Sequence, residues 1–267
     1  MDEEKFLSDR IIYYSGFAKL GRPAPFFFDL SFSKLAAEFK EVNEKPLSMK
    51  LSDEKVEGLI GLLEGHNQQF YLKLSGSDIT DMSVLRLQSL LEKSELIKGL
   101  DLSNTKLTVN GFRYLAHALL KNKSLESLNL RDTDPDFTTQ SKTLILTAAS
   151  SHPKLHTIDV GFIPAEGFDH LAKNFQFFEK FRSIALSEHP DSLFPCAVKD
   201  LLIKVVRERK DRLESLESIS VRLVSEDERF EQELASILVQ VRQNAAISLD
   251  LSLRDRTFNK KPKDLEL

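Results

Sequence analysis

Residues 96–131 read LIKGLDLSNTKLTVNGFRYLAHALLKNKSLESLNLR, and this stretch decides the fold. Near its two ends, a pair of leucines flanks one polar residue, in Leu100-Asp101-Leu102 and Leu128-Asn129-Leu130. Such alternation predicts a short strand with one buried and one exposed face. Between the two triplets, residues 108–120 carry apolar side chains at helical spacing, which predicts an amphipathic helix. The stretch therefore predicts a strand, a helix and a second strand.

The strand pattern recurs nine times along the chain. Its occurrences are residues 28–30, 49–51, 72–74, 100–102, 128–130, 158–160, 184–186, 219–221 and 249–251, whose first residues are 21, 23, 28, 28, 30, 26, 35 and 30 positions apart. A strand and a helix repeated at such a period cannot each bury their own apolar face, so consecutive repeats must stack on one another.

The stack predicts an α/β fold with strands on one side and helices on the other. Residues 80–95 repeat the helical pattern, and Thr80 and Thr108 are suited to be helix N-caps. Pro164 suits the first turn of a further helix that would reach Phe178. Because the helix layer is wider than the strand layer, the stack should curve with the sheet on its inner side.

The arrangement of the strands is a direct consequence of stacking. Residues 100–102, 128–130 and 158–160 should lie side by side as parallel neighbours. About nine parallel strands should line a concave face, with the helices on the convex face.

The stretch 96–131 closely resembles the leucine-rich repeats of the ribonuclease-inhibitor type. It has a strand, a short loop, Gly111 entering a helix, and an Ala/Leu-rich helix that ends in KNKSL. The resemblance covers roughly residues 25–253, more loosely at the flanks, and implies a horseshoe-shaped solenoid. The family has Asn or Cys at a loop position where this chain has small hydroxyl residues, able to satisfy some of the same backbone groups; these are Ser33, Ser77, Thr105 and Thr133.

A second resemblance concerns composition. The repeats are degenerate, and the chain is rich in Phe and Lys and has no Trp, which is similar to leucine-rich-repeat effectors that intracellular bacteria inject into host cells. This resemblance implies secretion into the host cytosol and a host protein as partner.

We predict three segments. Residues 1–24 should cap the N-terminal end of the stack, residues 25–253 should form one leucine-rich-repeat domain, and residues 254–267 should be a polar C-terminal tail.

Composition restricts the classes of partner. The formal net charge of −4 argues against nucleic acid, because phosphate binding needs an excess of Lys and Arg. The single cysteine, Cys196, fits a reducing, cytoplasmic environment. The acidic first residues do not resemble a signal peptide, and no apolar run approaches the ~18 residues of a membrane span.

The candidate binding surface is the exposed face of the predicted strands. The alternation places the following side chains on it: Phe27, Asp29, Lys50, Tyr71, Lys73, Asp101, Asn129, Arg131, Asp159, Ser220, Arg222 and Asp250. The alternative is that these polar residues merely solvate the sheet. Binding is favoured for the surface as a whole, because a bare parallel sheet is unusual.

A second candidate surface is a basic cluster in the longest gap between strands. It consists of Lys204, Arg207, Arg209, Lys210 and Arg212. A solvated helix face is the simpler interpretation, and a docking patch for an acidic partner or a membrane surface is the alternative.

Signals of catalysis are weak. His152 and His156 are four residues apart, but Pro153 separates them, so we expect no shared metal site. Phosphate-binding loops, nucleophile elbows and Cys-x-x-Cys pairs are missing from the sequence. We therefore predict a protein–protein interaction module that is not an enzyme and has no cofactor. The alternatives are an arm for assembly, or an accessory subunit of an enzyme whose chemistry is not visible.

Overall fold

The computed structural model describes residues 2–10, 26–44, 47–64, 69–133, 139–163, 181–188, 218–224 and 248–254. The chain divides into two units, Met1–Asp159 (unit 1) and Val160–Leu267 (unit 2). The helix predicted from Pro164, the basic cluster Lys204–Arg212 and most of the polar tail lie outside the described residues.

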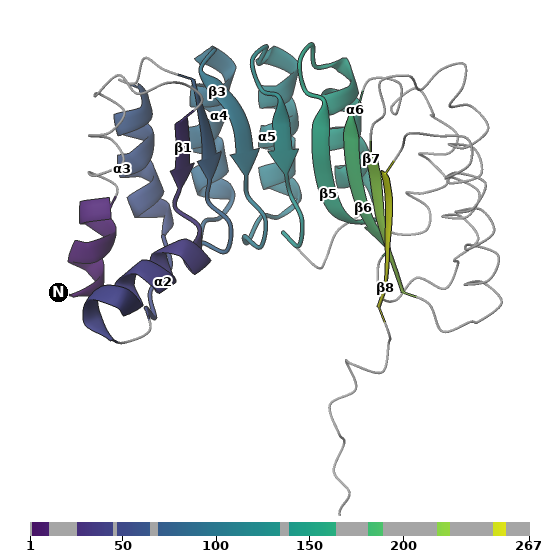
Figure 1. The fold of residues 1–267 in the computed structure, drawn as a ribbon. Helices are drawn as coiled ribbons and strands as arrows, with labels where there is room; N and C mark the ends of the chain where they lie inside the picture. The colour runs from purple at the N-terminus through teal and green to yellow at the C-terminus, as the bar shows by residue number, and fades with distance from the viewer. Residues whose placement is uncertain are drawn as a thin grey trace, which may run out of the picture. The chain divides into compact units, whose positions relative to one another are not determined.

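Unit 1 is built on parallel strands that pair in chain order. They are β1 (Phe26–Asp29), β2 (Phe70–Lys73), β3 (Ile97–Asp101), β4 (Ser127–Asn129) and the start of β5 (Thr157–Ile163) (Figure 1). In the register, Leu100 lies opposite Leu128, and Leu128 lies opposite Ile158. The prediction that these three segments are parallel neighbours is therefore confirmed.

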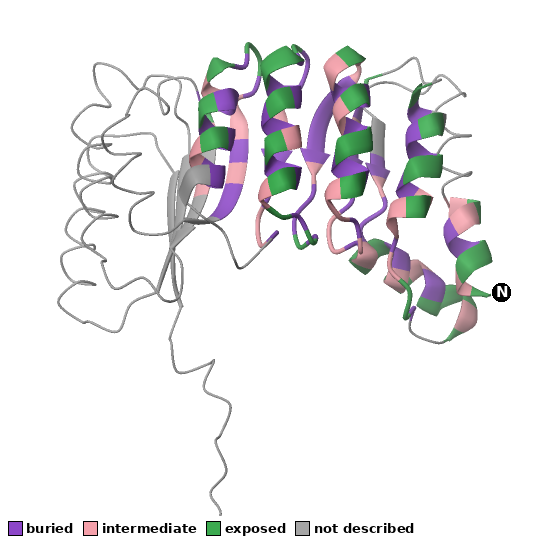
Figure 2. Cartoon of the chain, turned by 180° about the vertical axis from the view of Figure 1, so that it is seen from behind, coloured by how far each residue is buried: buried purple, intermediate pink, exposed green. Residues whose placement is uncertain are grey.

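Helices alternate with these strands. They are α2 (Phe32–Asn43), α3 (Asp53–Glu64), α4 (Asp81–Lys93), α5 (Val109–Lys121) and α6 (Thr139–Ser151). Figure 2 shows α3 to α6 in a row over one face of the sheet, with their buried residues toward it and their exposed residues outward. The predicted α/β alternation is therefore present in unit 1.

The N-terminal residues add a short helix to unit 1. Residues 3–10 are helical, and Phe6 meets Phe39 of α2 edge-on, with 5.1 Å between the ring centroids. An ion pair of 3.0 Å joins Arg10 to Glu38. The described part of the predicted capping segment thus packs against α2.

The strand predicted at residues 49–51 is wrong. β1 pairs directly with β2, and the chain between them carries two helices, α2 and α3. Leu51 is buried and accepts a backbone hydrogen bond of 2.9 Å from Asp78, so its apolar neighbourhood anchors a loop. The physical reason is length, because spacings of 21 and 23 residues are shorter than the 28 residues that separate the complete repeats beginning at residues 72, 100 and 128.

The correction also moves Lys50 away from the sheet. Its ammonium group lies 5.4 Å from the centre of the Phe32 ring, at the start of α2. Lys50 is therefore not part of the row of exposed strand residues, contrary to the prediction.

A column of leucines forms the spine of unit 1. The leucine that ends each triplet follows its strand, is fully buried, and continues the backbone pairing through its N–H group. The bonds run from Leu30 to Lys73 (2.9 Å), from Leu74 to Asp101 (2.8 Å), from Leu102 to Asn129 (2.9 Å) and from Leu130 to Asp159 (2.7 Å). Each such side chain is worth roughly 1.5–3 kcal/mol of burial, so the column is a main source of stability.

Small hydroxyl residues close the loop after each leucine. Thr105 donates to the carbonyl of Leu102 at 2.6 Å, and Thr133 donates to that of Leu130 at 2.9 Å. Ser77 makes the same bond to Leu74. The predicted role of these residues is therefore present, except that Ser33 lies within α2 instead.

Aspartates at the helix starts join one repeat to the next. Asp53 begins α3 and accepts hydrogen bonds from the N-cap Thr80 and from Ser83 of α4. Asp81 begins α4 and accepts from the backbone and hydroxyl of Thr108, the N-cap of α5. Burial raises the pKa of Asp53, but the hydrogen bonds from Ser83 and Thr80 outweigh it and lower this pKa below its usual 3.8. Both threonines are N-caps, as predicted.

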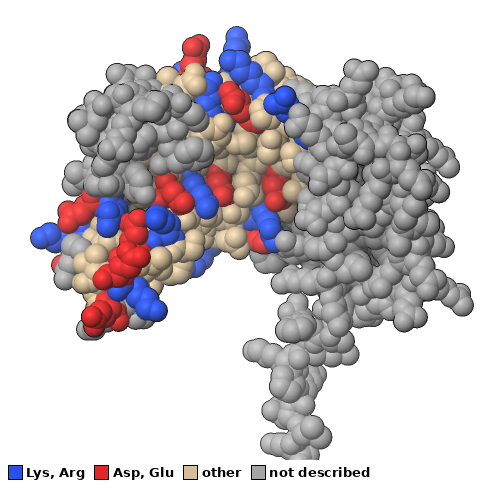
Figure 3. All heavy atoms as spheres, in the orientation of Figure 1, with Lys and Arg blue, Asp and Glu red and all other residues tan. Residues whose placement is uncertain are grey.

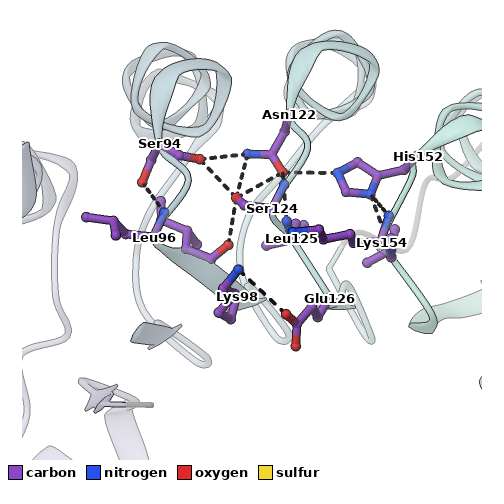
Figure 4. Close-up of polar contacts among 11 residues, drawn as sticks. Ser94, Leu96, Lys98, Asn122, Ser124, Leu125, Glu126, His152 and Lys154 are labelled. Atoms are coloured by element: carbon purple, nitrogen blue, oxygen red, sulfur yellow. Dashed lines mark hydrogen bonds and ion pairs between the residues drawn. The ribbon is translucent and has the colours of Figure 1, made fainter. Parts of the chain in front are cut away.

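At the other helix ends, Asn122 is the centre of a buried polar network (Figure 4). Its amide nitrogen donates to the carbonyl oxygens of Leu91 at 2.5 Å and Ser94 at 3.2 Å. Its oxygen accepts from the backbone N–H groups of Ser124 at 2.9 Å and Leu125 at 2.8 Å. One side chain thereby satisfies the backbone of two successive repeats.

His152 occupies the corresponding place in the next repeat. Its Nδ1 accepts from the backbone N–H groups of Lys154 at 3.2 Å and Leu155 at 2.9 Å. Because Nδ1 accepts, the proton lies on Nε2, which donates to the Asn122 oxygen at 3.0 Å. Both ring nitrogens of His152 are therefore used in hydrogen bonds that stabilise the fold.

We predict that Asn122→Ala lowers the free energy of unfolding by about 2–4 kcal/mol, because it leaves several buried backbone groups without partners. Urea unfolding followed by circular dichroism measures the change. Asn110→Ala, at an exposed position of the same helix, is the matched control and should change stability by less than about 0.5 kcal/mol. Equal effects of the two substitutions would contradict the role given to Asn122.

Helices α4 and α5 are also joined at their exposed surface by Glu92. Its carboxylate contacts Gln88 at 2.7 Å, His117 at 2.9 Å and Lys121 at 3.0 Å. The hydrogen bonds from Gln88 and Lys121, helped by His117 and the charge of Lys121, lower the pKa of Glu92 to about 2 against the opposing effect of burial.

We expect a carboxyl NMR titration to give Glu92 a pKa of about 2. A lowered pKa means that the folded state binds this proton less readily than the unfolded chain. The stabilisation is therefore complete above pH 4.5 and is lost as the pH falls toward 2. Lys121→Met should move the pKa upward, and an unchanged value would show that Lys121 does not contribute.

Unit 2 contains a second set of parallel strands. They are β6 (Ser183–Glu188), β7 (Ser218–Val224) and β8 (Ser248–Arg254), paired in chain order. They contain the triplets predicted at 184–186, 219–221 and 249–251. In the part of the chain that the structure describes, no helix is long and apolar enough to cross a membrane.

Candidate functional site

The exposed face of the unit 1 sheet brings polar side chains into one row. The register joins neighbouring strands through equivalent positions, in the order Asp29, Lys73, Asp101, Asn129 and Asp159. Since the apolar residues on either side of these positions are buried, strand alternation directs the row away from the helix layer. Figure 3 shows acidic and basic side chains interspersed on this face. The structure thus gathers five of the predicted binding residues in one line.

A second row lies two residues earlier on the same strands. It contains Phe27, Tyr71, Gly99, Ser127 and Thr157. We predicted Phe27 and Tyr71 but missed the other three. The signal was present, because side chains two positions apart on a strand share a face.

Part of the polar row supports the backbone. Where β1, β3 and β4 end, the side-chain oxygen accepts a hydrogen bond from the N–H group two residues further on. The three bonds are Ser31 to Asp29 at 3.2 Å, Ser103 to Asp101 at 2.9 Å and Arg131 to Asn129 at 3.1 Å. Aspartate and asparagine therefore serve equally in this turn.

The basic side chains of this region are paired with carboxylates. Lys73 lies 3.8 Å from Asp29 on the neighbouring strand. Arg131, after β4, lies 3.3 Å from Asp132. Both pairs are partly exposed, so each contributes little to stability, about 0–1 kcal/mol. In each pair, the carboxylate neutralises the positive charge of the basic side chain.

Tyr71 is fixed across the middle of the sheet by Gly99. A Cβ atom on Gly99 would lie 2.1 Å from the Tyr71 ring and 2.6 Å from the Ser127 hydroxyl. The ring therefore occupies the space that a side chain would take. Burial raises the pKa of Tyr71, and the charge of Glu126 and a hydrogen bond to it act in the same direction.

Glu126 is in turn held by Lys98. Their charged groups are 3.6 Å apart, and the Lys98 side chain is only 7% exposed (Figure 4). The pairing of Tyr71 with Gly99 skips Lys98, which is the extra residue of a β-bulge in β3. The bulge and its ion pair thus support the position of Tyr71.

The remaining candidates lie elsewhere. β7 carries Ser220 and Arg222, and β8 carries Asp250, with Ser220 opposite Asp250. The side chains of these residues and of Phe27 are outside the described part, as is the basic cluster Lys204–Arg212.

Among the described residues, no group of three or more His, Cys, Asp or Glu side chains is arranged to hold a metal ion. His156 lies beside Thr157, with 3.1 Å between Nδ1 and the hydroxyl oxygen, while His152 faces Asn122. The helix layer of unit 1 has a cavity of about 310 Å³ between α5 and α6, lined by Val109, Arg113, Ser141, Thr143, Leu144 and Thr147.

These features define the class of the protein as α/β, with a five-stranded parallel sheet that alternates with helices in unit 1. Neither a scan against protein-family models nor a search of the curated proteins finds a match.

We predict that Gly99→Ala displaces Tyr71 and lowers the free energy of unfolding by about 1–3 kcal/mol, because the new methyl group occupies the place of the ring. The same substitution in a Tyr71→Ala background should cost clearly less, since the space is then empty. Thermal or urea unfolding of the four proteins in this double-mutant cycle measures the coupling. Additive effects would contradict a direct contact between the two positions.

Proposed function

We propose that the chain is a leucine-rich-repeat solenoid of the ribonuclease-inhibitor type and that it binds a protein partner through the exposed face of its sheet. The repeated connections between repeats support this assignment. From Leu74 onward, the leucine-to-backbone bond, the loop hydroxyl and the helix N-cap each recur at an interval of 28 residues.

The observation that carries the binding proposal is the uncovered polar row. Across β2 to β5, helices cover one face, and no described helix covers the other (Figures 1 and 2). A parallel sheet normally has both faces covered. A binding partner would cover the exposed face of the sheet.

The size of the face sets a requirement on the interface. Five strands at ~4.8 Å spacing, exposed over ~15 Å of their length, offer roughly 350 Å². A standard interface buries about 800 Å² per partner. An interface of ordinary size must therefore extend beyond these five strands, onto loops or further strands. The similarity in composition to bacterial effectors adds the proposal that the partner is a host protein met in the cytosol.

The test compares two variants of the full chain with equal change in net charge. The face variant carries Lys73→Glu, Asp101→Asn and Arg131→Glu. The control variant carries Glu57→Gln, Arg86→Glu and Arg113→Glu on the helix layer. Asp101→Asn keeps the turn after β3, because Asn129 makes the same turn after β4.

We expect a partner captured from a cell lysate by the wild type and by the control variant to be lost from the face variant, at least about tenfold by quantitative mass spectrometry. Matching unfolding curves would show that all three proteins are folded. Capture that is equal for both variants, or that is lost only from the control variant, would overturn the proposal.

A further inference from the structure

In the described helix layer, the aspartate bridges end before the junction of α5 and α6. Asp53 begins α3 and Asp81 begins α4, and each carboxylate reaches the N-cap of the next helix. Where α4 meets α5, a Cβ atom on Gly111 would lie 2.4 Å from the Asp81 carboxylate, so this junction is closely packed. α5 begins with Val109, whose side chain accepts no hydrogen bond. The cavity of about 310 Å³ lies beside Val109, between α5 and α6.

The lining of this cavity is almost entirely carbon. α6 contributes Leu144, Thr143 and Thr147, and α5 contributes Val109 and Arg113. The Leu144 side chain is 39% exposed, so it keeps apolar surface that a ligand would remove from water, with a gain of roughly 25 cal/mol per Å². Ligand pockets range from roughly 300 to 1,000 Å³. A cavity at the lower end of this range suits a short apolar chain.

Arg113 gives the cavity a positive charge. It takes part in no ion pair among the described residues, and its guanidinium contacts the neutral Asn110 side-chain oxygen at 3.5 Å. By contrast, Arg86 of α4 is paired with Glu57 at 3.2 Å. Arg113 is exposed, and an arginine lays its stem along apolar surface while its charged head stays in water. Since no Asp or Glu lines the cavity, an anion at its edge meets a cation and no opposing charge from the lining.

We propose that the cavity between α5 and α6 binds a short aliphatic carboxylate. The apolar chain covers Val109 and Leu144, and the carboxylate is bound by the guanidinium of Arg113, whose fork of N–H donors matches two carboxylate oxygens. A neutral hydrocarbon leaves this cation unused, and an aliphatic amine is repelled by it. The site belongs to the helix layer, so it is independent of the binding function proposed for the sheet face.

The probe is hexanoate, titrated into the isotope-labelled full chain at low salt and followed by amide NMR shifts. We expect weak, saturable binding that shifts the signals of the residues lining the cavity. Hexanol has a chain of the same length without the charge and should bind about three- to fivefold more weakly, and hexylamine should bind more weakly still. Arg113→Gln should weaken binding of hexanoate about three- to fivefold and leave binding of hexanol unchanged.

A second variant, Val109→Asp, places an acidic residue at the start of α5, as in α3 and α4. It should weaken binding of hexanoate at least about fivefold, because it brings a negative charge into the cavity. Arg86→Gln is the matched control, since it removes one exposed cation from α4, and it should leave binding unchanged. Matching unfolding curves would show that all variants are folded.

Three results would overturn the proposal. The first is that hexanoate shifts no signal around the cavity. The second is that hexanol or hexylamine binds as well as hexanoate, which would show that the charge is not recognised. The third is that Arg113→Gln or Val109→Asp binds hexanoate like the wild type, which would place the binding elsewhere.

Discussion

The fold of unit 1 depends on one constraint, the in-register parallel pairing of strands that each end in a buried leucine. The N–H group of that leucine bonds to the carbonyl of the residue one repeat later, so the same residue that fills the core also fixes the register. A shift by one residue would turn every leucine to the opposite face. The aspartate bridges to the helix N-caps and the Asn122 network require this register, because each joins atoms that are about one repeat apart.

Repetition explains what the sequence could predict. Within residues 96–131, strand and helix periods succeed one another at full length, and the strands, helices and N-caps found there agree with the prediction. The same triplet pattern led to the wrong prediction of a strand at residues 49–51. A buried leucine that anchors a loop has the same local sequence as a leucine that ends a strand. Only the distance to the next repeat distinguishes the two cases.

The candidate site was predictable in position but not in chemistry. Alternation placed Tyr71, Asp101 and Asn129 on the exposed face, yet it gave no information about which charges are neutralised nearby. The role of Gly99 depends on the residue opposite it across a β-bulge, which pairs positions whose sequence separation does not fit the regular spacing. Such relations arise from packing between repeats, and the pattern of residues along the sequence does not predict them.

The bridges between Asp53 and Thr80 and between Asp81 and Thr108 have an evolutionary consequence. Each joins the first residue of one helix to the N-cap of the next, so donor and acceptor are both carried by a segment such as 81–108. A tandem copy of that segment would bring its own bridge with it, and the array would lengthen without any new interaction having to evolve. After Thr108, α5 begins with Val109, so within the described part of the chain growth of this kind would draw on the repeats before α5.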